Sequence, residues 1–190
     1  WLTAAGVLVL TGALAWMVFA VLHWIAQEQI IEDAHRVVAA ADFRAMQEME
    51  ARLEAQIEAE RSPVAVRTVE LALVRTILWS DYTGDPGRMT SVQRELDRSR
   101  ELGAPSHEVA LASGYLALAM GDLPSAELAL SRLDLNDPLC RDLTARVALQ
   151  LRDDQDSRDL LNGLGPATAE APLLELLSRE ALLTALDEFD

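Results

Sequence analysis

The first 27 residues contain no Asp, Glu, Arg or Lys, and Glu28 is the first charged side chain of this 190-residue chain. As a helix, the run WLTAAGVLVLTGALAWMVFAVLHWIAQ is about 40 Å long, whereas the hydrocarbon core of a bilayer is about 30 Å thick. Trp1 at one end, and His23 with Trp24 at the other, lie where interfacial aromatic residues are usual. The run predicts one membrane-spanning helix over residues 1–27.

A cleaved signal peptide is the competing interpretation of the same run. The apolar region of a signal peptide is about 7–15 residues long and is followed by a small-x-small cleavage site. The run here is longer, and residues 20–23, Ala-Val-Leu-His, offer no such site. We therefore expect the segment to stay attached and to contact membrane lipid.

The residues that flank the run predict its orientation. Trp1 is not a start methionine, and we expect a further N-terminal stretch before it. The visible flank carries Glu28, Glu32 and Asp33, and no Arg precedes Arg36. Because basic residues collect on the cytoplasmic side of a span, we expect the basic flank on the other side. Residues 28–190 would then be periplasmic, in a single-pass protein of a bacterial inner membrane.

Composition restricts the class of fold and of partner. The formal net charge of −15 lies entirely on residues 28–190, and it repels the phosphates of nucleic acid, which is not an expected partner. All 16 basic residues are arginine, a usage typical of GC-rich genomes. Only 5% of the residues are aromatic, and little of the chain resembles a strand, so an all-α chain is expected.

Residues 28–61 contain neither proline nor glycine. Apolar residues recur there every three or four positions from Ile30 to Ile57, with Glu and Arg on the opposite face. This spacing predicts helix. Two interpretations stay open: one continuous stalk, or two antiparallel helices separated at Ala41-Asp42-Phe43, which we slightly favour.

Turn signals divide residues 62–190 into a series of short helices. Ser62-Pro63 has the composition of an N-cap followed by the first helical residue, and Gly- or Pro-containing turns follow at intervals. The segments between these turns predict helices at 63–82, 89–102, 107–120, 124–133, 139–152, 156–162, 171–178 and 179–188. The expected organisation is a transmembrane helix (1–27), a helical stalk or first helical pair (28–61) and a helical domain (62–190).

Residues 107–138, HEVALASGYLALAMGDLPSAELALSRLDLNDP, resemble a tetratricopeptide repeat. The family has a glycine in the first helix, a Gly-Asp turn, an alanine in the second helix and a proline after it. These positions match Gly114, Gly121, Ala126 and Pro138 here. The resemblance implies that Gly114 and Ala126 face each other where the helices cross, that Gly121 is a left-handed C-cap, and that Pro138 ends the second helix.

Segments 70–105 and 141–165 share the layout of helix, Gly/Asp turn and helix, with little of the consensus. Asp residues recur in the turns at positions 85, 122 and 156, close to the 34-residue period of the family. The resemblance therefore implies a solenoid of antiparallel helical hairpins for the domain.

In such solenoids the first helices of successive hairpins line a concave face that binds peptides or partner helices. The resemblance places five candidate partner-binding residues on this face: Glu108, Leu111, Tyr115, Leu118 and Ala119. Tyr115 is the strongest candidate, because tyrosine combines a rigid apolar body with a polar tip. Leu111 and Leu118 are equally well explained as core residues.

The sequence contains no recognisable catalytic, nucleotide-binding or calcium-binding motif. The three histidines, His23, His35 and His107, have no second histidine or cysteine at ligand spacing, and Cys140 is the only cysteine. A lone thiol forms neither an intramolecular disulfide nor a zinc set. We expect no enzymatic activity, no cofactor and no metal site.

These features together favour a membrane-anchored scaffold for protein–protein interaction, or an accessory subunit of a larger membrane protein complex. The partners are then other proteins, and the lipid contact is made through residues 1–27. The alternative is a chaperone-like factor associated with protein secretion or envelope assembly.

The predicted topology is tested by washing membranes with carbonate and by adding protease to spheroplasts. We expect the protein to remain in the membrane fraction and residues 28–190 to be digested from outside. Release by carbonate would contradict the span, and full protection from protease would place the domain in the cytoplasm.

Overall fold

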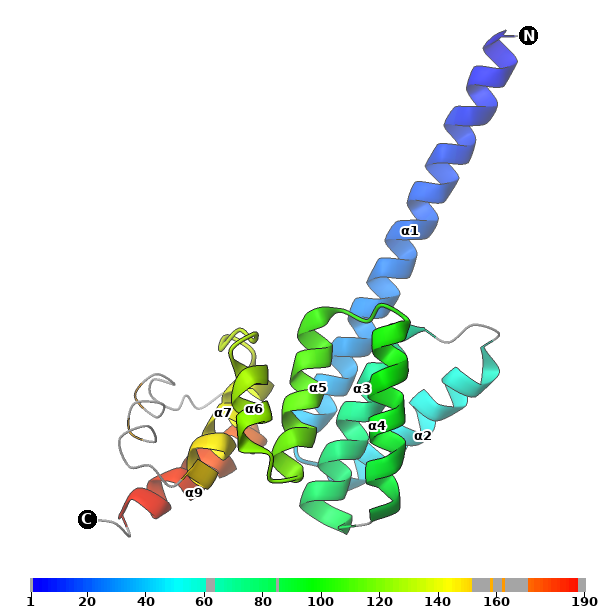
Figure 1. Ribbon diagram of the computed structural model, residues 1–190. Helices are drawn as coiled ribbons and strands as arrows, with labels where there is room; N and C mark the ends of the chain where they lie inside the picture. The colour runs from blue at the N-terminus through cyan, green and yellow to red at the C-terminus, as the bar shows by residue number, and fades with distance from the viewer. Residues whose placement is uncertain are drawn as a thin grey trace.

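Every regular element that the structure describes is helical. The structure is a computed structural model and describes residues 2–60, 64–84, 86–151, 158, 162 and 171–187. The expectation of an all-α chain is confirmed for these residues. Their helices, labelled in Figure 1, are α1 (Leu2–Ala39), α2 (Phe43–Ala59), α3 (Ala65–Ile77), the π-helix η1 (Leu78–Thr83), α4 (Pro86–Glu101), α5 (Ser106–Ala119), α6 (Leu123–Leu130), α7 (Pro138–Leu151) and α9 (Leu173–Asp187).

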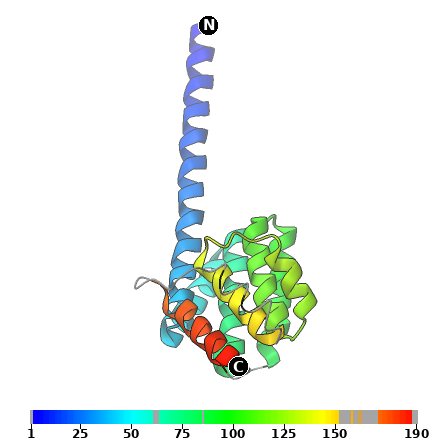
Figure 2. The ribbon, with the colours of Figure 1, turned by 90° about the vertical axis from the view of Figure 1, so that its left-hand side faces the viewer.

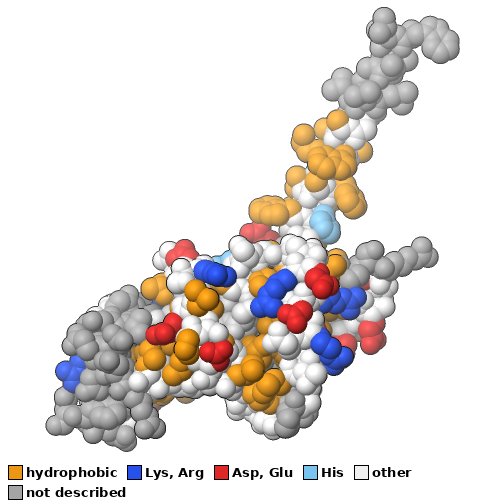
Figure 3. All heavy atoms as spheres, in the orientation of Figure 1, with side chains coloured by type: hydrophobic (Ala, Val, Ile, Leu, Met, Phe, Trp, Pro, Cys, Tyr) orange, Lys and Arg blue, Asp and Glu red, His pale blue; other side chains and the backbone are white. Residues whose placement is uncertain are grey.

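Helix α1 projects away from the other helices over much of its length (Figures 1 and 2). Apolar side chains gather on the coloured stretch of the projecting part (Figure 3), where Trp16 and Phe19 are 73% and 68% exposed. The part Gly12–Ala39 contains an 18-residue window with a mean hydropathy of 1.3 and is long and apolar enough to span a membrane. The helix continues without interruption to Ala39, so it extends past the predicted boundary at residue 27.

The chain turns sharply between α1 and α2. Ala41 has a φ of 50°, in the left-handed region, which ends the helical path. Asp42 then caps α2, because its carboxylate accepts hydrogen bonds from the N–H groups of Arg44 and Ala45 at 2.9 and 3.1 Å. Tyr82 donates to the Ala41 carbonyl at 3.0 Å. The interpretation with two helices is confirmed, and the continuous stalk is wrong.

Helix α3 is the central helix of the bundle. Ten of its 13 residues are buried, since α1, α2, α4 and α5 all pack against it. A helix that is apolar on nearly all sides requires such complete coverage. The core continues through α5 and α7, where Leu111, Leu139 and Leu143 are each at most 1% exposed.

Neighbouring helices along the chain pack together, α3 with α4 and α5 with α6, while α3, α5 and α7 follow one another through the bundle. In Figure 2, α1 lies on one side of the bundle and α4 to α6 lie on the other. The end of α1 packs against α3, on the side of the bundle away from α4 to α6.

The turn between α5 and α6 has the predicted left-handed glycine. Gly121 has a φ of 75°, its N–H donates to the Leu118 carbonyl at 3.0 Å, and the Asp122 N–H donates to the Ala117 carbonyl at 2.9 Å. This pair of bonds is a Schellman motif. Asp122 then accepts from the Ser125 N–H and caps α6.

Pro138 does not end the second helix of the repeat-like segment, contrary to prediction. Helix α6 already ends at Leu130, and Pro138 is the first residue of α7. Proline is suited to this position because it lacks only an N–H that the first helical turn leaves unbonded anyway. The Asp137 carboxylate accepts from the Leu139 N–H at 2.8 Å and supplies the cap.

Several other predicted boundaries also differ. The single helix predicted over 63–82 is divided into α3 and η1, and the two predicted at 171–178 and 179–188 are one helix, α9. Ser106 is the first residue of α5 rather than its cap, which is Pro105. The predicted cap at 62–63 and the predicted helix at 156–162 lie outside the described residues, apart from isolated positions in the latter.

Gly114 lies where α5 is crossed by two helices. A Cβ atom at this position would be 2.6 Å from Leu143 Cδ2 on α7 and 3.2 Å from Ala129 Cβ on α6. The nearest side chain on α6 is thus Ala129, three residues after the predicted Ala126, although Ala126 is itself completely buried. The absence of a side chain at Gly114 permits this approach.

This contact predicts a loss of stability for Gly114→Leu. The added side chain must displace Leu143 or separate α5 from α6, which costs about 1–3 kcal/mol or more and lowers the melting temperature by several degrees. Thermal unfolding of the full chain in detergent, followed by circular dichroism, measures the effect. Ala55→Leu adds the same group at an exposed position of α2 and serves as the control; equal melting of the two variants would contradict the crossing.

Candidate functional site

The C-terminal ends of three successive helices surround a groove of about 400 Å³. Segment η1, which follows α3, forms one wall, and the last turns of α5 and α7 form the others. We call this the C-terminal groove; its lining residues are Trp79, Ser80, Asp81, Gly84, Tyr115, Leu118, Ala119, Arg146, Leu149 and Gln150.

The wall made by η1 has an unusual backbone. The Gly84 N–H donates to the Trp79 carbonyl, five residues earlier, at 2.8 Å, and Gly84 has a φ of 61°. π-Helical turns are rare and often occur at functional sites, because the extra residue per turn redirects side chains. Here the indole Nε1 of Trp79 is buried and has no hydrogen-bond partner within the described part of the chain.

Arg146 connects the walls of the groove. Its Nη1 and Nη2 donate to the two carboxylate oxygens of Asp81 at 2.9 and 2.8 Å. Its Nε lies 2.8 Å from Asp142 Oδ2, and its Cζ lies 6.0 Å from the centre of the Tyr115 ring. One guanidinium therefore joins η1, α5 and α7, and the paired geometry with Asp81 fixes its plane.

Asp142 is completely buried beneath this guanidinium. Its carboxylate accepts hydrogen bonds from the Tyr115 hydroxyl at 2.6 Å and from the Ser178 hydroxyl of α9. Burial raises the pKa of Asp142 although the charge of Arg146 opposes the shift. Burial and the charge of Asp142 raise the pKa of Tyr115, so the phenol stays protonated and donates.

The structure brings three of the five predicted partner-binding residues to the C-terminal groove: Tyr115, Leu118 and Ala119. Tyr115 is only 2% exposed, and its hydroxyl is already bonded to Asp142 and to the Leu139 carbonyl. Leu111 is completely buried in the core. Glu108 lies at the other end of α5. The binding of a partner by these residues stays a prediction.

The opposite, N-terminal ends of α3, α5 and α7 hold a second cluster, formed by His35, Glu70, Glu108 and Asp137. His35 reaches it from α1: its Nε2 lies 3.1 Å from Glu108 Oε2 and 3.7 Å from Glu70 Oε2, and its Nδ1 lies 3.5 Å from Asp137 Oδ2. We call this the acid–histidine cluster. It joins α1 to three helices of the domain.

The charges of the acid–histidine cluster are strongly coupled. Burial by itself would lower the pKa of His35, but hydrogen bonds with Asp137 and Glu108 and the charge of Glu70 raise it to about 10. Burial raises the pKa of Glu70 despite the nearby imidazole. Even with His35 protonated, a single positive charge faces three carboxyl groups.

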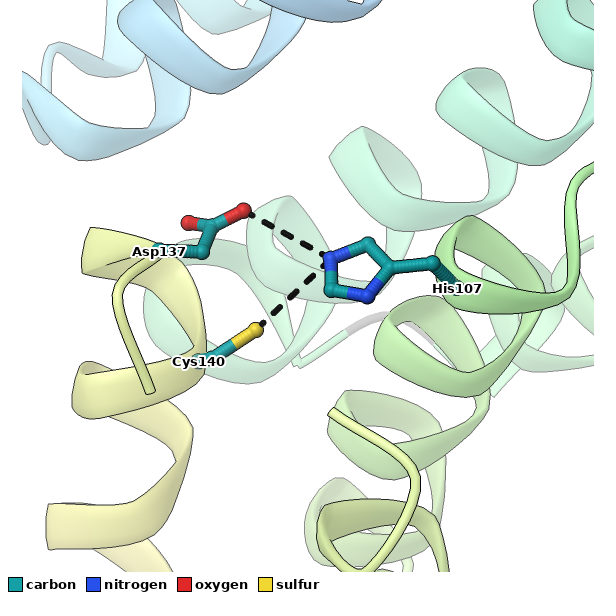
Figure 4. A group of neighbouring side chains, drawn as sticks. All are labelled: His107, Asp137 and Cys140. Carbon is teal, nitrogen blue, oxygen red and sulfur yellow. Dashed lines mark hydrogen bonds and ion pairs between the residues drawn. The ribbon is translucent and has the colours of Figure 1, made fainter. Parts of the chain in front are cut away.

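His107 and Cys140 extend the cluster on its Asp137 side (Figure 4). His107 Nε2 lies 3.8 Å from Asp137 Oδ2 and 4.0 Å from Cys140 Sγ. Burial raises the pKa of Cys140 to about 12, so the side chain is a thiol at neutral pH. Two sets of side chains thus have metal-ligand chemistry and spacing: His35 with Glu70 and Glu108, and His107 with Asp137 and Cys140.

Local spacing in the sequence does not reveal these clusters. His35 and Glu108, for example, are 73 positions apart. One signal is present: Glu70 interrupts the apolar run of α3, between Val69 and Leu71, at a position where an unpaired charge is costly. Asp81 and Arg146 are 65 positions apart, and no feature of the sequence indicates that they pair.

The contacts of Arg146 predict a large loss of stability for Arg146→Gln. Removing the guanidinium leaves Asp142 buried without its opposite charge, which costs about 3–5 kcal/mol. Urea unfolding of the full chain in detergent measures the change in the free energy of unfolding.

Arg44→Gln is the matched control for that variant. Arg44 pairs with Glu48 at the same i,i+4 spacing, but both side chains are exposed, so the cost should be less than about 1 kcal/mol. Asp142→Asn combined with Arg146→Gln should recover part of the loss. Equal costs for the two single variants would mean that Arg146 does not compensate a buried charge.

Comparison with protein-family models, with curated proteins and with solved structures finds no match for this chain.

Proposed function

We propose that this protein is a membrane-anchored scaffold that binds another protein in the C-terminal groove. The observation that carries the proposal is the place of the groove, at the same end of the three successive helices α3, α5 and α7. In tetratricopeptide-like solenoids, which residues 107–138 resemble, the first helices of the hairpins line the peptide-binding face. The packing of α3 with α4 and of α5 with α6 is compatible with such hairpins.

The anchor supports a scaffold that acts close to the membrane. Because α1 runs without a break from its apolar part into the bundle, the groove keeps a set distance from the bilayer. Basic residues collect on the cytoplasmic side of a membrane span. The residues that follow the apolar part are mostly acidic, which favours a periplasmic domain. A fixed domain above the inner membrane suits an accessory subunit of a membrane protein complex.

The lining of the groove indicates the kind of segment that it takes. Trp79 and Leu149 offer partly exposed apolar surface, while Ser80 and Gln150 are exposed polar groups at the rim. Asp81 and Arg146 are paired with each other, so the groove itself presents little net charge. The net charge of −15 on the rest of the domain attracts basic partners at long range. We propose an apolar peptide segment flanked by basic residues, contributed by another membrane protein.

Filling the groove tests this function. Ala119 lines it at the end of α5, where a basic side chain is compatible with the helix dipole, so Ala119→Arg should obstruct the groove while the domain stays folded. The protein is purified from its native membrane in mild detergent, and the proteins that accompany it are quantified by mass spectrometry. We expect one partner to be reduced by about tenfold or more, as for the loss of an interface contact of about 1.4 kcal/mol or more.

Ala55→Arg adds the same side chain to the exposed face of α2 and should retain that partner. Unchanged circular dichroism and melting of both variants are required for the comparison. If the two variants retain the same proteins in the same amounts, the groove is not the binding surface.

A further inference from the structure

We infer that His35, Glu70 and Glu108 form a binding site for one divalent transition-metal ion, of which Zn²⁺ is the probe proposed below. The inference is independent of the scaffold function, because it concerns the opposite ends of α3 and α5. A metal at this position would join α1, the helix that leaves the membrane, to two helices of the domain.

The spacing of the three side chains fits one metal ion. Two ligand atoms, each about 2.1 Å from a zinc ion at tetrahedral angles, are about 3.4 Å apart. His35 Nε2 lies 3.1 Å from Glu108 Oε2 and 3.7 Å from Glu70 Oε2. One distance is slightly shorter and the other slightly longer than the separation expected for two zinc ligands. The ligand atoms of all three residues lie within 4.8 Å of one another. A small shift of the side chains therefore suffices to place an ion between them.

Glu70 supplies the observation for which an ordinary ion pair does not account. Its side chain is 1% exposed, and neither of its carboxylate oxygens has a hydrogen-bond partner among the described residues. Buried polar atoms without a protein partner are uncommon in folded proteins, and a bound water molecule or ion can satisfy them. Since Glu70 Oε2 points toward His35 Nε2, a metal between them would satisfy this carboxylate.

The charge of the cluster also favours a divalent cation. Glu70, Glu108 and Asp137 bring three carboxyl groups against the single imidazole of His35. When all three carboxyl groups are ionised, a proton on His35 compensates one of three negative charges, whereas a divalent cation compensates two and leaves His35 neutral. Glu108 stands in the first turn of α5, and Asp137 caps α7, where the helix dipoles stabilise negative charge but add no cation.

Asp137 would act as the outer-shell partner of the metal site. Its Oδ2 lies 3.5 Å from His35 Nδ1, so the proton of a neutral His35 lies on Nδ1 and Nε2 is directed at the metal. Carboxylate–histidine–metal arrangements of this kind orient the imidazole and raise its basicity. The same Oδ2 faces His107 Nε2 at 3.8 Å (Figure 4), which makes His107, Asp137 and Cys140 the alternative location for an ion.

A route from solvent to the cluster is present. A pocket of about 600 Å³ lies between α1 and the first residues of α7 and α9, and both His35 and Asp137 line it. The His35 side chain is 16% exposed, so the imidazole is open to solvent on the side of this pocket. Imidazole with two carboxylates is a donor set suited to Zn²⁺, Mn²⁺ or Fe²⁺.

Zinc titration of the full chain in detergent, freed of metal by chelation, tests the inference by isothermal calorimetry. We expect one equivalent of Zn²⁺ to bind and to raise the melting temperature. Glu70→Gln and Glu108→Gln should each weaken binding by about 100-fold or more, since loss of an outer-shell partner alone costs about 10–100-fold. Glu70→Gln replaces a buried carboxyl group by a neutral amide of the same shape, so the variant should fold without metal and melt no lower than the metal-free wild type.

Glu95→Gln is the matched control, because Glu95 is a partly buried carboxylate of α4 that pairs with Arg75, outside the cluster. It should bind Zn²⁺ as the wild type does. The inference is overturned if the wild type binds no stoichiometric Zn²⁺, or if Glu70→Gln binds it with unchanged affinity. It is also overturned if Cys140→Ser abolishes binding while the two glutamine variants retain it, because the ion then belongs to the neighbouring set.

Discussion

The contact between α1 and the N-terminal ends of α3, α5 and α7 is the constraint on which the arrangement of the whole protein depends. Helix α1, which is long and apolar enough to span a membrane, ends against the domain, and His35 makes this junction by facing Glu70, Glu108 and Asp137 at 3.1–3.7 Å. The charges are largely withdrawn from water, so the junction is held by directional polar contacts in addition to apolar packing. After the turn at Ala41 the chain forms α2, which packs against α3.

The same three helices present different chemistry at their two ends. Glu108 and Asp137 lie at the N-terminal ends of α5 and α7, where the helix dipoles stabilise their negative charge. Glu70 faces them from the second turn of α3. The C-terminal ends of the three helices surround the C-terminal groove, where Arg146 supplies the positive charge. A cation is favourable near the C-terminal end of a helix, because the helix dipole is negative there. Tyr115, Asp142 and Ser178 tie the floor of the groove to α9. A partner in the groove and a cation in the acid–histidine cluster would therefore act on the same helices from opposite ends.

Local features of the sequence predicted the helices and their breaks well. Ala41-Asp42-Phe43 was the slightly favoured place for a break between two helices, and Gly121 has the left-handed conformation that its position after α5 requires. Predictions that relied on a consensus were less accurate. Pro138 begins α7 instead of ending α6, because proline is compatible with both sides of a turn. Gly114 meets Ala129 and Leu143, since the exact crossing depends on how α6 and α7 are placed.

By itself, the sequence determined that the chain is helical, that its first helix is long and apolar enough to span a membrane, and where most turns fall. These properties depend on residues within a few positions of one another, through helical periodicity, capping and backbone conformation. Only the tertiary structure decided which charges meet. Glu70 and Glu108 converge on His35, and Asp81 meets Arg146, because packing brings distant helices together. A spacing of tens of residues carries no local trace of such contacts, and the candidate sites of this protein consist of them.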